Sequence, residues 1–532
     1  MTIASRDPRP SGRLSTPSPV RRTFSTLAVA VATLVPGLTA LACSSTAEAP
    51  VGSSEGAVNY RATTGQEYAL EADIRFVLTG EEQTAAQESF DKRDAVVKAA
   101  AQSRMDAITS AVNSELTKRW PEDLRTKRQG SVALMVRQTP PNFGSLHEAD
   151  DGGTFAFTYS LEFGAQFDFD AKLATKESGG KRFLSLDVPA LTNTGNSETD
   201  GHVDLEVKKV ERSRNAYPKY DDLFADGLDI YFQMGGDYND SRGDLRHAKY
   251  LYEELVATGF TSPVAKYDDL KLDSGALKKT IKVRGKDTEV RVRIVHAEMT
   301  TADTREKLID AYKDAAKTAD IVYYSGHAGT SLGYSGVAVA YKPSRVALPA
   351  SEFKNLDVPD RYQVFVFDGC ETYTGYADKF YENPKKNPEN ADVVTVVNFS
   401  ATQEKPNQAY GFLRSVLAEK GGGWVPRSWD SILEKVNEAA DTSWVHVYGV
   451  HGIDDNPKLS PLADTSKFGA VCAKDADCGS VDSYCLTVAE GEGGKRCGLA
   501  CADTKGCPGE ARCSFLQGYP SSDDRQCIPT AR

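Results

Sequence analysis

Between about residues 216 and 456, short apolar runs alternate regularly with amphipathic helical segments. This alternation is typical of a mostly parallel sheet with helices on both faces, because parallel neighbours are joined by crossover helices and strands buried on two faces become continuously apolar. The expected strands are GLDIYFQMGG, EVRVRIVHAEMT, ADIVYYSG, YQVFVFDG, ADVVTVVNFS and SWVHVYGV, with a hairpin inserted before the second. The expected helices span 244–260, 301–319, 407–420 and 429–440. We therefore predict an α/β domain over residues 216–456.

Two of these strands end on side chains that can carry out nucleophilic chemistry. The segment ADIVYYSGHAGT places His327 just after the third strand, and YQVFVFDGCETY places Cys370 just after the fourth. Sequential strands are usually neighbours, and reactive groups collect where parallel strands end. When a cysteine lies beside a histidine, the thiol can act as a nucleophile and the imidazole as its general base and acid. The alternatives are a cysteine buried as a small apolar residue and a histidine with structural hydrogen bonds.

The motifs SGHAG and DGC, their 43-residue spacing and the segment 300–328 resemble the caspase-like cysteine peptidases, the group that includes caspases, metacaspases, legumains, clostripain and gingipains. The segment 227–260 resembles the first strand and helix of that fold. The resemblance covers roughly 240 residues and implies a cysteine endopeptidase with His327 as catalytic histidine and Cys370 as nucleophile. It also implies an oxyanion hole made of the backbone amides of Ala328, Gly329 and Cys370.

The same resemblance suggests how substrate is bound. Asp368 matches the acidic residue that helps line the S1 pocket in metacaspases and legumains, and Glu371 is closer to the legumain pattern. Together the carboxylates favour a basic or amide P1 side chain, although an aspartate at a strand end can simply cap a helix. Ala328 stands where the family has glycine. A weakly active or inactive enzyme is therefore an alternative interpretation. The alternative function is a non-catalytic surface lipoprotein that uses a degenerate caspase-like fold and a cysteine-rich module for binding.

Residues 1–42 have the features of an export signal. A basic segment containing Arg21-Arg22 precedes an apolar run at 27–42 that is too short and too broken for a good spanning helix. The arginine pair resembles a twin-arginine signal, and the general secretory route stays open. Cys43 follows the signal and resembles a lipidation cysteine, with simple secretion as the alternative. We expect 43–59 to be a flexible tether, and the protein to be an exported cell-envelope lipoprotein or a secreted protein.

Eight of the ten cysteines fall in a Gly- and Asp-rich stretch, predicted to be a separate module at 471–532 behind a linker at 457–470. A segment this small cannot bury enough core, so four disulfides are expected to staple it. Zinc is the alternative, but the stretch has no histidine and no C-x-x-C. The eight residues are Cys472, Cys478, Cys485, Cys497, Cys501, Cys507, Cys513 and Cys527.

Residues 60–215 are predicted to form an α+β domain. Strands are expected at 67–80, 131–140, 154–169, 182–191 and 202–211, many with alternating polar and apolar residues. A helical stretch at 81–120 contains no glycine or proline. No residue pattern in this domain indicates a particular reaction.

Charge and composition limit the partners. The formal net charge of -12 disfavours a general nucleic-acid or anionic-membrane surface. We expect a protein or peptide substrate, and membrane contact only through a lipid anchor. No cofactor is required and no site metal is expected. The segment GIDDNPKLS, 452–460, carries paired carboxylates and is a candidate calcium-binding site. The alternative is a solvated turn.

Overall fold

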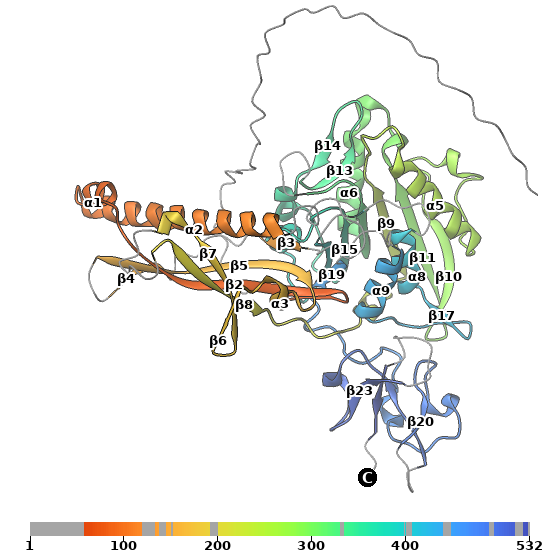
Figure 1. The fold of residues 1–532 in the computed structure, drawn as a ribbon. Coiled ribbons are helices and arrows are strands. Elements are labelled where there is room, and N and C mark those ends of the chain that lie inside the picture. Colours follow the sequence, from red (N-terminus) through yellow and green to blue (C-terminus); the bar gives the residue numbers. More distant parts are fainter. Residues whose placement is uncertain are drawn as a thin grey trace, which may run out of the picture. The chain divides into compact units, whose positions relative to one another are not determined.

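The computed structural model of the chain is shown in Figure 1. The predicted signal peptide, Cys43 and most of the tether lie outside the described residues. Among the residues that the structure describes, no helix combines the length and apolar character needed to cross a membrane. The structure describes residues 58–119, 134–137, 145–149, 153–191, 200–329, 335–397, 400, 407–439, 448–488, 494–516 and 525–529.

The predicted α/β region forms a mixed eight-stranded sheet in which β16, β15, β12, β9 and β11 run parallel to one another. The hairpin partner β10, the strand β19 and the edge strand β1 run antiparallel to their neighbours. In spatial order the strands are β1 (Tyr60–Ala62), β19 (Tyr448–His451), β16 (Ala391–Val396), β15 (Gln363–Asp368), β12 (Ile321–Ser325), β9 (Leu228–Met234), β11 (Lys286–Val295) and β10 (Leu277–Val283).

Helices cover both faces of this sheet, which explains why its central strands β12, β15 and β16 are buried throughout. Along β12, Tyr323 packs into the core that includes residues of α5, α8 and α9, whereas Val322 and Tyr324 pack into the core that includes residues of α6 and α7. Successive side chains of a strand point to opposite faces, so both sets are buried. The helices are α4 (Tyr220–Leu223), α5 (Gly243–Ala257), α6 (Glu306–Thr318), α7 (Tyr376–Tyr381), α8 (Gln408–Val416) and α9 (Trp429–Ala439).

Two small hairpins complete this region. Their strands are β13 (Val337–Ala340) with β14 (Val346–Leu348), and β17 (Glu419–Lys420) with β18 (Gly423–Trp424).

The N-terminal region forms a second, antiparallel sheet with a long helix packed on it. Its strands are β2 (Gly65–Val77), β3 (Leu134–Arg137), β4 (His147–Glu148), β5 (Thr154–Gln166), β6 (Lys176–Ser178), β7 (Lys181–Asp187) and β8 (His202–Lys209). Its helices are α1 (Gly80–Ala86), α2 (Phe90–Arg119) and α3 (Phe169–Leu173). On α2, Ala101, Met105, Ile108 and Val112 recur at helical spacing and are buried in the core of this sheet.

The predicted helical stretch at 81–120 is divided in two. Thr79 begins α1 with a capping box in which its side chain accepts from the Glu82 amide. The Ser89 hydroxyl accepts from the amide of Lys92 at the start of α2. Serine competes for backbone hydrogen bonds in this way, which ends one helix and begins the next.

The first residues of the predicted α+β domain contribute a strand to the larger sheet. Residues Tyr60–Ala62 were expected in the N-terminal domain, but they pair with β19 as the edge strand of the eight-stranded sheet. Arg61 holds this strand in place, because its guanidinium donates two hydrogen bonds to Asp430 of α9, at 2.8 and 2.7 Å. The chain therefore enters the larger sheet before it builds the N-terminal one.

The C-terminal module contains the expected four disulfides, arranged as two similar halves. In each half the first cysteine bonds to the third and the second to the fourth. The bonds are Cys472–Cys485 and Cys478–Cys497, then Cys501–Cys513 and Cys507–Cys527. Its strands are β20 (Cys485–Thr487), β21 (Lys495–Cys497), β22 (Leu499–Ala500), β23 (Arg512–Phe515) and β24 (Arg525–Ile528). Such bonds persist in oxidising compartments, which is consistent with export.

Candidate functional site

The ends of β12 and β15 bring His327 and Cys370 to the same edge of the sheet. The two strands are parallel neighbours, and Ser325 lies opposite Asp368 in their register. The ladder continues one step further, because the amide of Gly326 donates to the carbonyl of Asp368 at 3.0 Å. His327 and Cys370 each follow this aligned pair by two residues, and neighbouring strands lie about 4.8 Å apart.

The His327 ring is held from several sides. Its Nε2 lies 3.1 Å from Oδ1 of Asp237. Tyr238 stacks on one face, with ring centroids 4.4 Å apart, and Tyr341 approaches edge-on at 5.3 Å. Within the described part of the chain, Nδ1 of His327 makes no hydrogen bond, so it is the nitrogen available for proton transfer.

Asp237 is a residue of the candidate site that sequence reasoning missed. Its carboxylate accepts from the amides of Asn239, at 2.9 Å, and Gly243, at 3.1 Å. Burial opposes ionisation, but these bonds and the His327 ring together lower its pKa, so the group stays ionised and can orient the imidazole. Its position three residues after β9 was the available signal, since carboxyl ends of parallel strands gather functional groups.

Cys370 is held as a thiol in this conformation. Its Sγ donates to the carbonyl of Ser400 at 3.5 Å. Burial raises its pKa to about 11, and the neighbouring charges of Glu371 and Asp368 act in the same direction. No hydrogen bond joins His327 to Cys370 among the described residues. A reaction at this sulfur therefore needs a base that removes the proton as the substrate binds.

Asp368 lies behind Cys370 as a buried hydrogen-bonding centre. The hydroxyls of Tyr323 and Ser325 donate to its Oδ2, both at 3.1 Å, while Tyr448 donates to Oδ1 at 2.7 Å and Ser400 donates to the same oxygen. Each of these donors is a hydroxyl and none is a helix amide, so these bonds give no support to the helix-capping alternative. Because Ser400 contacts both Asp368 and the Cys370 thiol, the predicted S1 acid is linked to the candidate nucleophile.

Glu371 has an unusual backbone conformation. Its φ angle is 59°, in the left-handed region that non-glycine residues rarely adopt. Such strain is found mainly where surrounding structure holds it, often beside active sites. The residue directly after the candidate nucleophile is therefore fixed by its environment.

The backbone groups predicted for the oxyanion hole differ from one another. Ala328 is almost fully buried, and a Cβ at residue 369 would overlap its methyl group and lie 2.7 Å from the Gly326 carbonyl oxygen. Only glycine fits at position 369, and the Ala328 methyl is directed towards it. The amide of Gly329 forms a long 3.5 Å bond to the Tyr376 hydroxyl. Gly329 is thus engaged inside the protein in this conformation.

The GIDDNPKLS turn lies at the opposite edge of the sheet. Asn456 donates to Asp392 at 2.6 Å, at the start of β16, whereas His327 and Cys370 follow strand ends. Asp454 accepts from the Asn59 side chain at 3.3 Å, and Asp455 pairs with the Lys219 ammonium. The carboxylates considered for calcium are thus already engaged with protein donors.

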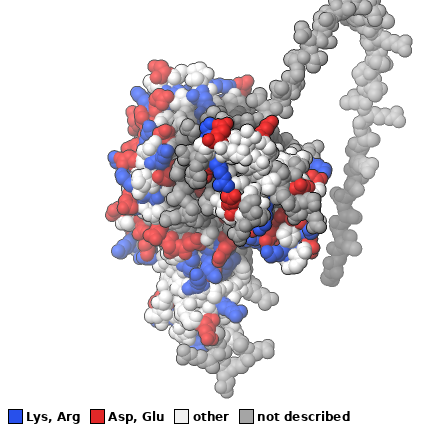
Figure 2. All heavy atoms as spheres, turned by 90° about the vertical axis from the view of Figure 1, so that its left-hand side faces the viewer, with Lys and Arg blue, Asp and Glu red and all other residues white. Residues whose placement is uncertain are grey.

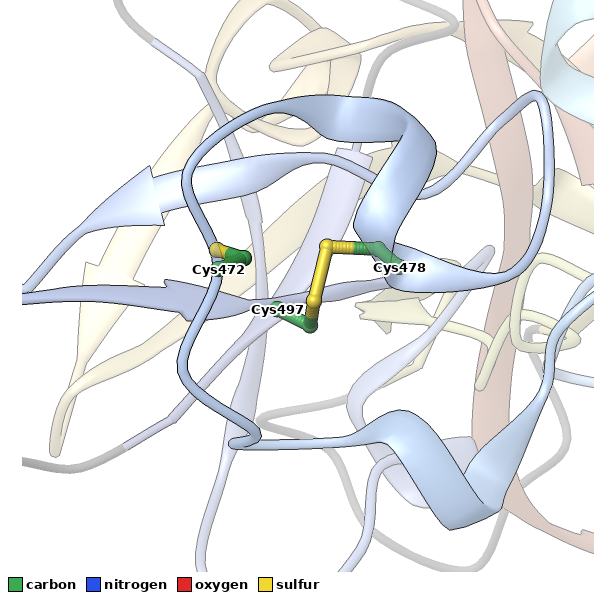
Figure 3. Close-up of side chains that lie close together, drawn as sticks. All are labelled: Cys472, Cys478 and Cys497. Carbon is green, nitrogen blue, oxygen red and sulfur yellow. A yellow bond between two sulfur atoms is a disulfide. The ribbon is translucent and has the colours of Figure 1, made fainter.

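Sulfur atoms of the C-terminal module lie close enough to resemble metal ligands, as around Cys472, Cys478 and Cys497. Figure 3 shows Cys478 and Cys497 joined by a disulfide, with Cys472 beside them. Cys472 is itself bonded to Cys485. Zinc binds thiolates, and sulfur atoms joined in disulfides do not supply them.

Acidic and basic side chains are interspersed on the face drawn in Figure 2. On the N-terminal sheet, Lys176 pairs with Asp204 at 2.6 Å, and Lys181 pairs with Glu206 at 3.0 Å. These lysines are compensated by neighbouring carboxylates, so they do not form a row of positive charge of the kind that binds phosphates.

Searches against protein-family models, curated proteins and solved structures give no match to this chain. What the site can do therefore rests on its own geometry.

Proposed function

We propose that this protein is an exported cysteine endopeptidase of caspase-like fold, with His327 and Cys370 as its catalytic pair. The observation that supports this most is the register of β12 and β15, which aligns the two residues at the carboxyl edge of one sheet. Asp237 adds a third member, because an ionised carboxylate beside Nε2 favours the imidazolium form that appears during the reaction.

The proposed reaction proceeds through a thioester. His327 takes the Cys370 proton at Nδ1, and the sulfur attacks the scissile carbonyl carbon to form a C–S bond. Backbone amides of Cys370 and Ala328 donate to the developing oxyanion. His327 then gives its proton to the leaving amine as the C–N bond breaks. A water molecule, deprotonated by His327, hydrolyses the thioester and restores the thiol.

The proposed specificity is for a basic or amide P1 side chain. Asp368 and Glu371 place two carboxylates beside the nucleophile, and charge complementarity favours a positive or hydrogen-bond-donating partner. Because four hydroxyl groups already donate to Asp368, we expect it to contribute mainly through its charge and Glu371 through direct contact.

We propose further that Cys43 is lipidated and anchors the protein at the cell envelope. The disulfides of the C-terminal module support an oxidising compartment, and the sequence after Cys43 has the composition of a tether. Intact mass of the membrane fraction, compared with a Cys43→Ser variant, tests the anchor.

A second candidate is a non-catalytic binding lipoprotein. The raised pKa of Cys370 and its hydrogen bond to the Ser400 carbonyl favour this alternative, because both keep the thiol protonated. Under this alternative the C-terminal module and the degenerate fold bind a protein or a glycan, and Cys370 is a structural residue.

Cleavage of a mixed peptide library separates the two functions. The protein is produced by export, so that the C-terminal module oxidises, and assayed with and without calcium beside a Cys370→Ala control. The peptidase proposal predicts cuts after Arg, Lys or Asn that vanish in the control. Cuts after Asp or Glu would contradict the specificity alone. Absence of cleavage, together with absence of Cys370 labelling by an electrophile in the folded protein, would favour the binding lipoprotein.

A further inference from the structure

A buried hydrogen bond ties the loop that carries Cys370 to the N-terminal sheet. Tyr373, three residues after Cys370, donates its hydroxyl proton to the carboxylate of Glu67 on β2, at 2.8 Å. Tyr373 is 1% exposed and Glu67 3%, so this bond is shielded from water. Removing one partner of a buried hydrogen bond weakens the hydrogen bonding of the other, which is costly.

Tyr373 is also packed by residues of both sheets. From the larger sheet, the ring of Tyr60, on β1, meets Tyr373 edge-on with centroids 5.2 Å apart. On β5 of the N-terminal sheet, a Cβ at Gly164 would lie 2.8 Å from a methyl group of Val397 and 3.4 Å from the Tyr373 ring. Glycine at position 164 thus lets the β5 backbone lie directly against the end of β16 and the nucleophile loop.

Further contacts of this loop lie within the larger sheet. Thr372 donates to the Phe367 carbonyl at 2.8 Å and accepts from the Val396 amide, and the Tyr373 amide donates to the Val396 carbonyl. These bonds fix the loop on one side only. Tyr373 fixes it on the side of the N-terminal sheet, and the strained Glu371 lies between Cys370 and these anchors.

We propose that Glu67 is a positioning residue for Cys370, acting through Tyr373 to hold residues 370–375 in the conformation that catalysis requires. The inference rests on the proposed peptidase function and deepens it. The N-terminal domain is then a working part of the active site, and not a segment whose removal activates the enzyme. A removable inhibitory segment would act in the opposite direction, since its release would increase cleavage.

Three variants of the full exported chain test this inference. Tyr373→Phe and Glu67→Leu remove the hydrogen bond, whereas Glu67→Gln keeps an acceptor oxygen and is the conservative rescue. Tyr159→Phe is the matched control, because the buried Tyr159 hydroxyl bonds to Thr109 within the N-terminal domain, at 3.2 Å. Each variant is measured for peptide-library cleavage, for the pH profile of Cys370 alkylation by iodoacetamide, and for Tm.

Loss of positioning has a signature that simple destabilisation lacks. We expect Tyr373→Phe and Glu67→Leu to cleave at least tenfold more slowly while iodoacetamide alkylates Cys370 at least threefold faster at pH 7.5, because the loosened loop exposes the thiol. Glu67→Gln and Tyr159→Phe should stay within about twofold of the wild type in both assays.

Several outcomes would overturn the inference. Faster cleavage in Tyr373→Phe would identify an inhibitory contact, and unchanged rates, or rates that fall together with Tm, would assign a structural role only. A wild-type protein that neither cleaves peptides nor reacts at Cys370 would instead remove the proposed function itself. An active wild type with unaffected variants would remove only the role of Glu67.

Discussion

Asp368 and Asp392 are buried aspartates on neighbouring parallel strands, but they lie at opposite edges of the sheet. Both oxygens of Asp368 accept hydrogen bonds, and every donor is a hydroxyl that can rotate. At Asp392, Tyr362, Trp429 and Asn456 all donate to Oδ2, while Oδ1 has no partner among the described residues. The hydrogen bonds at the carboxyl ends of the parallel strands can therefore rearrange beside His327 and Cys370. Those at the amino ends belong to the packed core.

Substitutions near the two aspartates should therefore differ in whether they change the reactivity of Cys370 or the stability of the fold. Substitutions around Asp368 are expected to act on Cys370, because Ser400 contacts both residues. Substitutions at Asp392 are expected to act on folding alone.

The largest effect is expected for Cys370→Ala. Cleavage should fall by at least a thousandfold, since the proposed nucleophile is lost, while Tm changes by only a few degrees because a small side chain is removed. Peptide cleavage and thermal unfolding of the same sample measure both quantities. A variant that retains cleavage would show that another residue carries the reaction.

Asp392 should make stability depend on pH. Burial raises its pKa in the folded protein to about 7, against about 4 in an unfolded chain, so the folded state holds a proton that the unfolded state has released between these values. Its contribution to stability is therefore greatest at low pH and is lost as pH rises through 7, by about 2–3 kcal/mol between pH 5 and 8.

Urea unfolding of wild type and Asp392→Asn at pH 5 and pH 8 isolates this contribution. The variant should lack that share of the pH dependence, and cleavage relative to wild type should not change. Equal pH dependence in the two proteins would show that Asp392 titrates normally.

Asp368→Asn is the matched change at the other edge. An amide offers one acceptor oxygen where the carboxylate offers two, so some of the four hydroxyls lose their acceptor and unfolding becomes about 1–3 kcal/mol easier. Unlike Asp392→Asn, this variant should also change the rate of Cys370 alkylation. An unaltered alkylation rate would separate Asp368 from the nucleophile and weaken the comparison between the edges.

The smallest effect is expected for Asp237→Asn. Asparagine can still accept from His327 Nε2, but it lacks the negative charge that favours the imidazolium, so kcat should fall about tenfold with little change in KM. Steady-state kinetics on a cleaved library peptide measures both constants. A change confined to KM would assign Asp237 to substrate binding.

The sequence predicted the local features of this protein well. Alternation of apolar runs and helices identified the parallel strands, and the positions of His327 and Cys370 after two of them followed from strand ends. The disulfide module was also predicted, and the similar spacing of Cys472–Cys478 and Cys501–Cys507 could have revealed its two halves.

Long-range pairing could not be predicted in the same way. Tyr60–Ala62 is too short to carry a periodic signal, and its partner β19 lies almost 400 residues later in the chain. The Glu67–Tyr373 bond depends on how two sheets pack, which no local pattern encodes. Asp237 was missed for a similar reason, because only the folded sheet brings it to His327.

The most direct test of the central claim is whether His327 controls the reactivity of Cys370. Alkylation of Cys370 by iodoacetamide at pH 7 should be compared between wild type and His327→Ala, with the alkylated residue identified by mass. If the two residues form a catalytic pair, the variant should react at least tenfold more slowly, because the thiol loses its base. Equal rates in the two proteins would contradict the pair and leave Cys370 a structural residue.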